Sequence, residues 1–225
     1  DLHSFPTRRS SDLDLKQLIL ECYRKKEIPS AMCAPEIMNI ELTTRCPLRC
    51  PQCYCDLNQG KDIEKEVALK YIEQAARLKI PFINLSGGET LVYPHLTELL
   101  EYISDKGLSS AIAISGWGFD FKKLKEFTRA GVDEIYVSLN GSTEEVNAQS
   151  RDGYEMAIQA LELLKADQQS QYYINWVARN DNIDDFPALV GLAKKYGVKG
   201  VVVLESKPDA SYVIQAALSK DKFLF

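Results

Sequence analysis

The segment with the clearest chemical potential is rich in cysteine. Four of the six cysteines fall within residues 46–55, which read CPLRCPQCYC. Thiolates are protein ligands of zinc and of iron–sulfur clusters. Cys46, Cys50 and Cys53 follow one another at spacings of x3 and x2, so one short loop can wrap around a compact inorganic core. Three thiolates can hold three irons of a four-iron cluster and leave the fourth iron open to a substrate.

A zinc site is the alternative use of these thiols. Structural zinc sites take four ligands, usually as two separated pairs, and Cys55 lies too close to Cys53 to be a good fourth ligand. The only two histidines, His3 and His95, exclude a histidine-rich metal site. A disulfide framework would spread its cysteines along the chain, whereas none follows Cys55. We therefore expect reduced thiols and a cytoplasmic protein.

Further polar groups lie at or after the ends of apolar runs later in the chain. The first is Gly87-Gly88-Glu89, where adjacent glycines let a ligand approach backbone carbonyls and Glu89 adds a negative charge that suits an ammonium group. Taken alone, this motif is equally a plain glycine turn. The other groups are Ser115, Ser138, Asn140 and Arg151.

These later groups have functional and structural interpretations. The Arg151 guanidinium offers a bidentate fork for a carboxylate. As an alternative, Arg151 is a solvated surface charge, and Ser115 and Ser138 are ordinary strand ends. The choice depends on whether the fold brings them to the cysteines.

The elements that must position these residues alternate between two kinds. Between the apolar runs lie stretches with apolar residues at helical spacing, which predict helices. Strands that alternate with helices predict a parallel sheet, because parallel strands need crossover connections. The predicted strands are 37–43, 82–86, 110–115, 134–139, 172–178 and 200–205, and the predicted helices are 14–26, 62–79, 96–106, 120–130, 154–164, 184–196 and 211–218.

Two architectures fit this order of elements: an open doubly wound sheet, and a barrel or partial barrel. Periodicity does not separate them. The strands are β-branched runs, as expected when both faces of the sheet are covered. In both architectures ligands bind at the carboxyl ends of the strands, which is where the polar groups described above fall.

Three segments are expected along the chain. Residues 4–13 read SFPTRRSSDL, without helical period and similar to a translated sequencing adapter, so we interpret 1–13 as a non-native or disordered tail. Residues 14–36 are predicted to form an N-terminal helix and loop. Residues 37–225 form the core, which we expect to be truncated at its C-terminus.

Charge and hydropathy exclude some partners. The chain of 225 residues has a net charge of −5, which provides no basic surface for nucleic acid. The longest apolar runs, such as 111–114 and 201–204, are too short to span a bilayer. We expect neither nucleic acid nor a membrane as a partner.

The combined motifs resemble the radical S-adenosylmethionine (SAM) superfamily over about residues 38–205. The cysteine triplet after a first strand, the GGE motif one unit later, and the SLNG segment followed by Arg151 carry the resemblance. The last pattern is similar to members that have a C-terminal SPASM domain, which is absent from this chain. The resemblance implies an α/β fold, a partial (β/α)6 TIM-type barrel with parallel strands.

The resemblance also implies cofactors and residue roles. Cys46, Cys50 and Cys53 would ligate a four-iron four-sulfur cluster, and SAM would bind the fourth iron. The remaining implied SAM contacts are Gly87, Gly88 and Glu89 for the amino group, Ser115 facing SAM, Ser138 and Asn140 for the ribose, and Arg151 for the carboxylate.

The implied activity is radical chemistry. Flavodoxin or ferredoxin would reduce the cluster, SAM would be cleaved to a 5′-deoxyadenosyl radical, and the radical would abstract hydrogen from a substrate. A peptide substrate is expected, as in peptide maturases and enzyme-activating members. The alternatives are a radical SAM enzyme of small molecules and, in another class, a zinc-stabilised non-radical βα protein.

Two residues depart from the family pattern. Gln52 stands where an aromatic residue is usual near the adenine, although an amide can hydrogen-bond the base. Asn140 stands where aspartate is common, which removes one charge near the ribose. Neither departure touches cluster ligation.

Overall fold

The computed structural model describes residues 24–25, 35–167 and 170–205. The chain divides into two compact units, Asp1–Glu36 and Ile37–Phe225, and the six strands of the sheet belong to the second. The predicted tail at 1–13, the predicted helix at 211–218 and most of the one at 14–26 lie outside the described residues.

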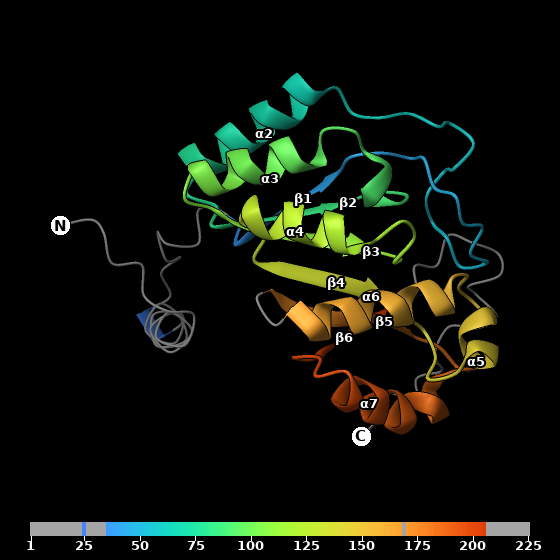
Figure 1. The fold of residues 1–225 in the computed structure, drawn as a ribbon. Helices are drawn as coiled ribbons and strands as arrows, with labels where there is room; N and C mark the ends of the chain where they lie inside the picture. The colour runs from blue at the N-terminus through green and yellow to red at the C-terminus, as the bar shows by residue number, and fades with distance from the viewer. Residues whose placement is uncertain (1–23, 26–34, 168–169, 206–225) are drawn as a thin grey trace. The chain divides into compact units, whose positions relative to one another are not determined.

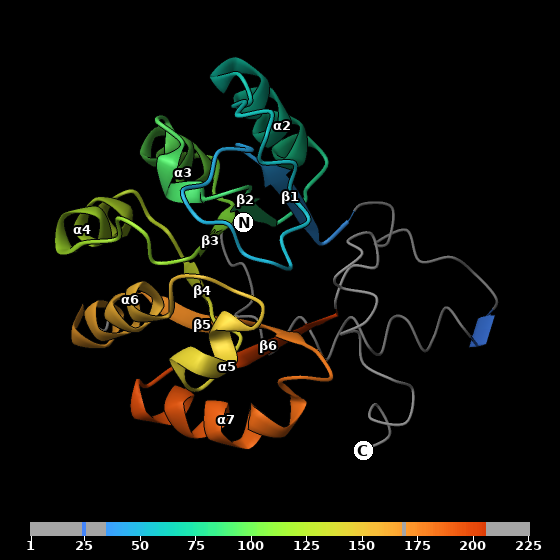
Figure 2. The ribbon, with the colours of Figure 1, turned by 90° about the vertical axis from the view of Figure 1, so that its right-hand side faces the viewer.

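The second unit is built on a six-stranded parallel sheet whose order is β1-β2-β3-β4-β5-β6. Each strand pairs with its neighbour in sequence, whereas a doubly wound sheet reverses its order at a switch point. The barrel-type prediction is therefore confirmed, and the sheet curls into a half-barrel (Figure 2). The strands are β1 (Ile37–Glu41), β2 (Phe82–Ser86), β3 (Ser109–Ile114), β4 (Glu134–Ser138), β5 (Gln171–Ala178) and β6 (Val201–Glu205).

The helices lie along the outer side of this curled sheet (Figures 1 and 2). One short helix, α5, was not predicted, because its five residues carry too few apolar positions to show a period. In the described ranges, no helix is long and apolar enough to cross a membrane. The helices are α2 (Lys65–Arg77), α3 (Leu96–Asp105), α4 (Phe121–Arg129), α5 (Glu144–Ala148), α6 (Tyr154–Asp167) and α7 (Phe186–Lys195), with 3-10 turns η2 (Thr90–Val92) and η3 (Ile183–Asp185).

Helix ends follow the local signals in the sequence. The Asp120 carboxylate accepts a hydrogen bond from Lys123 N at 2.8 Å and caps α4 as predicted. Gly107 and Gly131 follow α3 and α4 with φ of 69° and 85°. Glycine takes this conformation at little cost, so it ends a helix efficiently.

The two faces of the sheet differ in polarity. Ile83 and Leu85 of β2 are fully buried on the helix side, whereas Asn84 between them bonds to Asn39 across the strands at 2.7 Å. The prediction that both faces are covered is therefore wrong for β1, where Asn39 and Glu41 are exposed. The half-barrel leaves this inner face polar.

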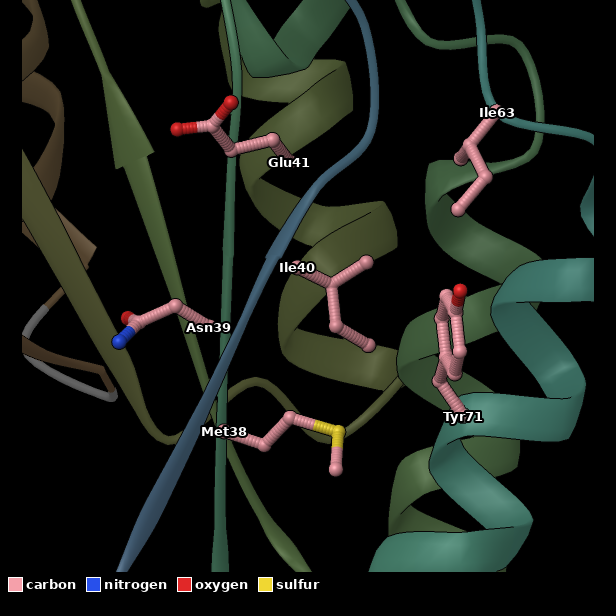
Figure 3. Close-up of a pocket in the computed structure, with 6 residues that line it drawn as sticks. All are labelled: Met38, Asn39, Ile40, Glu41, Ile63 and Tyr71. Atoms are coloured by element: carbon pink, nitrogen blue, oxygen red, sulfur yellow. The ribbon is translucent and has the colours of Figure 1, made fainter.

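A pocket of about 320 Å³ lies beside edge strand β1. Figure 3 shows Ile40 and Met38 pointing to the same side as Tyr71 of α2, whereas Asn39 and Glu41 point the other way. None of the predicted site residues lines this pocket.

The β3–α4 loop provides a stability test of the fold. A Cβ at Gly116, whose φ is 95°, would lie 2.3 Å from Met156 O of α6, whereas one at Gly118 (φ 64°) meets nothing within 4 Å. We expect Gly116→Ala to cost roughly 2–4 kcal/mol of unfolding free energy, from backbone strain plus overpacking. Gly118→Ala should cost about 1 kcal/mol, from strain alone. Chemical denaturation of both variants measures the difference, and equal losses would contradict the packing of this loop on α6.

Candidate active site

The predicted site residues lie in segments that follow the carboxyl ends of β1 to β4. Because the strands are parallel, these segments meet at one edge of the sheet, at the right in Figure 1. The cysteine loop follows β1, and Gly87 to Glu89 follow β2. Ser115 follows β3, Ser138 ends β4, and Arg151 lies between α5 and α6.

The cysteine loop is clamped at its base. Thr43 and Asp62, at its two ends, form an isolated antiparallel bridge, and Thr43 Oγ1 donates to the Asp62 carboxylate at 2.6 Å. The Arg45 guanidinium pairs with the same carboxylate at 2.7 and 2.8 Å. The loop therefore leaves and returns to the core at one fixed point.

The end of β2 packs directly on this base. Gly88 N donates to Thr43 O at 2.6 Å, and Glu89 N donates to Arg45 O at 2.9 Å. A Cβ at Gly87 would lie 2.5 Å from Thr43 O, and one at Gly88 would lie 2.3 Å from Arg45 O. Both positions thus require glycine for the protein's own packing, a reason that the sequence did not reveal.

Glu89 links the ends of β2 and β3. Its side chain is 1% exposed, and its carboxylate accepts hydrogen bonds from Leu91 N at 3.1 Å and from Ser115 N at 2.9 Å, with a further one from Ser115 Oγ. Burial raises the pKa of Glu89, and these hydrogen bonds oppose the rise. The carboxylate therefore has a positioning role, and the predicted interaction with the SAM ammonium stays a prediction.

The loop cysteines are half-buried free thiols. Burial raises the pKa of Cys46 and of Cys50. A hydrogen bond from the Cys55 thiol is the main cause that lowers the pKa of Cys53 to about 6, and the same bond raises the pKa of Cys55. The Cys55 Sγ also lies 3.6 Å from Gly87 O, so Cys55 links the cysteine loop to the glycine motif.

Arg151 is brought to the cysteines. Its half-buried side chain donates from Nε to Ser138 O at 3.3 Å. Its charge opposes the rise that burial causes in the pKa of Cys50 and of Glu89. Arg151 thus lies within electrostatic range of both motifs, which favours the functional interpretation over an isolated surface charge.

Asn140 is held by the protein itself. The residue is 1% exposed, its Nδ2 donates to Ser150 Oγ at 2.8 Å, and its Oδ1 accepts from Val177 N at 3.1 Å. Its backbone N donates to Asn147 Oδ1 at 2.8 Å. These bonds fix the loop after β4, and the predicted ribose contact stays a prediction.

Two observations bear on what the site could hold. In the described part of the chain, no three His, Cys, Asp or Glu side chains converge on a point that suits a single metal ion. The Gln52 Oε1 atom, within the cysteine triplet, is buried and has no hydrogen-bond partner in the protein. An unpaired buried acceptor is costly, and a ligand donor would satisfy it.

A family model for the radical SAM superfamily matches residues 40–193. The match contains the cysteine triplet, the glycine motif and Arg151. The chain belongs to the radical SAM superfamily. This membership confirms the predicted family and the prediction of an enzyme. It also confirms the predicted cofactors, because this family uses a four-iron four-sulfur cluster and SAM.

Individual relatives and solved structures are similar to this radical SAM chain. The PqqA peptide cyclase of Methylorubrum populi is 32% identical over 197 residues, which are 84% of this chain and 51% of the relative. The chain thus spans about half the length of the curated relatives it matches. Streptococcus suis SuiB has a TM-score of 0.71 at 14% identity, covering 94% of this chain and 49% of SuiB. Methylornithine synthase has a TM-score of 0.67 at 17% identity, covering 83% and 59%.

The three thiols of the radical SAM motif fit a cluster. They come from one clamped loop and are half-buried, and thiolate is the ligand that iron–sulfur clusters use. Sequence reasoning missed the residues that hold this loop, namely Arg45, Asp62, Cys55 and Asp152. The only signals in the sequence were the acidic residues Asp62 and Asp152. Acidic residues are common on protein surfaces, so these two did not stand out.

The thiol pKa values lead to a test on metal-free protein. Because the pKa of Cys53 lies at about 6, Cys53 is mostly thiolate at neutral pH and should react with iodoacetamide faster than Cys46 and Cys50. Cys55→Ala removes the hydrogen bond that lowers this pKa, so alkylation of Cys53 should slow on the order of three- to tenfold. Mass spectrometry with fragment ions assigns each site.

Cys46 serves as the internal control in this experiment. Burial is the largest cause that raises its pKa, and the neighbouring Cys53 is a smaller one. Its alkylation rate should therefore change much less than that of Cys53 in Cys55→Ala. An unchanged rate at Cys53 in that variant would show that the thiol pair is not coupled.

Proposed function

We propose that this chain is the SAM-cleaving part of a radical SAM enzyme that acts on a peptide. The observation that carries the proposal is the meeting of three thiols, the glycine motif and Arg151 at the carboxyl edge of the sheet. Cys46, Cys50 and Cys53 would ligate the cluster. When bound and reduced there, a cluster would supply the one electron needed for cleavage of SAM to methionine and a 5′-deoxyadenosyl radical, and that radical would take a hydrogen atom from the substrate.

The chain's own residues bind and orient in this proposal. The backbone of Gly87 and Gly88 would receive the SAM amino group, and Arg151 would pair with its carboxylate, where a guanidinium offers two parallel donors. The unpaired Gln52 Oε1 would accept from the adenine amino group. Glu89 would act mainly by holding Ser115, which is predicted to face SAM.

Ser138 and Asn140 are proposed near the ribose. Arg151 bonds to the backbone carbonyl of Ser138 and leaves its hydroxyl available. Asn140 keeps one Nδ2 hydrogen beyond its bond to Ser150. Ser138 ends β4 and Asn140 follows it, and Arg151 lies 13 residues beyond Ser138.

The peptide substrate is supported by the sequence relative whose name includes a peptide cyclase activity, at 32% identity. The similarity to solved structures supports the fold alone, because identities are 14% and 17%. A small molecule is the second candidate, favoured by the polar inner face of the sheet around Asn39 and Asn84. We further propose flavodoxin or ferredoxin as reductant and the cytoplasm as compartment, in keeping with four free thiols in one loop.

The test is anaerobic. The full chain is reconstituted with iron and sulfide, mixed with SAM and dithionite, and 5′-deoxyadenosine is quantified by mass spectrometry. We expect product well above that of Cys50→Ala, which should lose iron loading and SAM cleavage together. Cys22→Ala is the matched control, since Cys22 lies outside the triplet, and it should behave as the unaltered chain.

Each negative result has a distinct meaning. A loaded cluster without product would overturn the proposed SAM contacts. A folded protein that binds zinc and takes up no iron would favour the structural zinc interpretation.

A further inference from the structure

Residues 150–152, about 100 positions further along the chain, form hydrogen bonds with the cysteine loop. Asp152 Oδ2 accepts from Arg49 N at 2.8 Å, and Asp152 N donates to Cys50 Sγ at 3.4 Å. Gln52 N donates to Ser150 O at 3.3 Å. Three hydrogen bonds thus join residues 49–52 to residues 150–152, which connect α5 to α6.

The geometry of this contact depends on Asp152 itself. Its carboxylate is short enough to reach the backbone of the facing loop while its own N–H points at sulfur. Gly153 follows with φ of 82°, and a Cβ there would lie 3.3 Å from Leu48 Cδ1. The Arg49 guanidinium instead donates to the carbonyls of Cys46 and Leu48, so Asp152 acts here as a hydrogen-bond acceptor for the backbone and not as an ion-pair partner.

The segment is itself anchored in the core. Ser150 is buried and its hydroxyl accepts from Asn140 Nδ2. The Arg151 N and carbonyl groups bond to Asn147 O and Asn147 Nδ2, both at 2.8 Å. Asp152 therefore transmits the position of the β4–α6 connection to the cysteine loop.

We propose that Asp152 is a positioning residue for cluster binding, which holds the loop at Arg49 and directs its own N–H to the Cys50 sulfur. The inference rests on the proposed function, because the sulfur matters most when it ligates a cluster. Hydrogen bonds to ligand sulfurs are among the features that set the reduction potential of iron–sulfur clusters. Asp152 would thereby act on the cluster through the loop that carries its ligands.

The first test needs no cluster. Hydrogen–deuterium exchange of residues 48–53 is compared among the unaltered full chain, Asp152→Ala and Asp152→Asn. Asp152→Ala removes the acceptor for Arg49 N, so exchange should accelerate about fivefold, as for one lost hydrogen bond. Asp152→Asn keeps an acceptor oxygen in place and should restore slow exchange. Asp105→Ala, at the exposed C-terminal end of α3, is the matched control and should exchange like the unaltered chain.

The second test uses protein reconstituted with iron and sulfide. Asp152→Ala and Asp152→Asn remove the same negative charge, so the comparison between them isolates the hydrogen bond. The midpoint potential of the cluster should be lower in Asp152→Ala than in Asp152→Asn, because the N–H to sulfur bond is loosened. If Asp152→Ala fails to fold, Asp152→Glu replaces it, since the extra methylene displaces the acceptor oxygen.

The outcomes separate the two proposals. Unchanged exchange in Asp152→Ala, or equal acceleration in Asp152→Asn, would overturn the positioning role whatever the cluster does. Equal potentials in Asp152→Ala and Asp152→Asn would overturn its effect on the cluster. A chain that never binds iron but shows the expected exchange pattern would retain the role of Asp152 in the loop and reject the proposed function.

Discussion

The backbone contact between the ends of β1 and β2 is the constraint on which the rest of the site depends. Gly88 N reaches Thr43 O at 2.6 Å and Glu89 N reaches Arg45 O at 2.9 Å, so the cysteine loop starts directly over the glycine motif. No side chain fits between them, since a Cβ at Gly88 would lie 2.3 Å from Arg45 O. The cysteine loop and the glycine motif, which are distant in sequence, are thereby fixed next to each other.

Further hydrogen bonds connect this contact to the loops at the carboxyl ends of β3 and β4. Glu89 extends it to β3 through Ser115. From β4, Asn140 extends it to Ser150, and the segment after Ser150 returns to the cysteine loop at Asp152. The loop is thus held from the β2 side and from the β4 side. Side chains fixed in this way lose little entropy on ligand binding, which is the advantage of a preorganised site.

More of the fold than of the site could be predicted from the sequence. The alternation of apolar runs and helical periods predicted every strand to within two residues at each end, because such patterns depend on neighbouring residues. It left the order of the strands open, because strand order depends on contacts between distant residues. The thiol triplet was visible because its spacing is local. The roles of Glu89 and Asn140 were not, because each depends on partners 26 and 37 residues away. Asp152 was missed for the same reason, with its partner 103 residues away.

The incomplete barrel accounts for the polarity that the strand sequences carry. A closed barrel fills its interior with layers of apolar side chains, whereas here Asn39 and Asn84 bond to each other on the inner face and Tyr136 stacks on Tyr173 at 5.1 Å. On the opposite side of the same strands, Ile83 and its neighbours are fully buried against helices. Stability therefore comes from one face of the sheet, and the other face is left free to carry hydrogen-bonding groups beside the cysteine loop. The same division explains why a parallel sheet, usually apolar on both sides, tolerates alternating polar residues here.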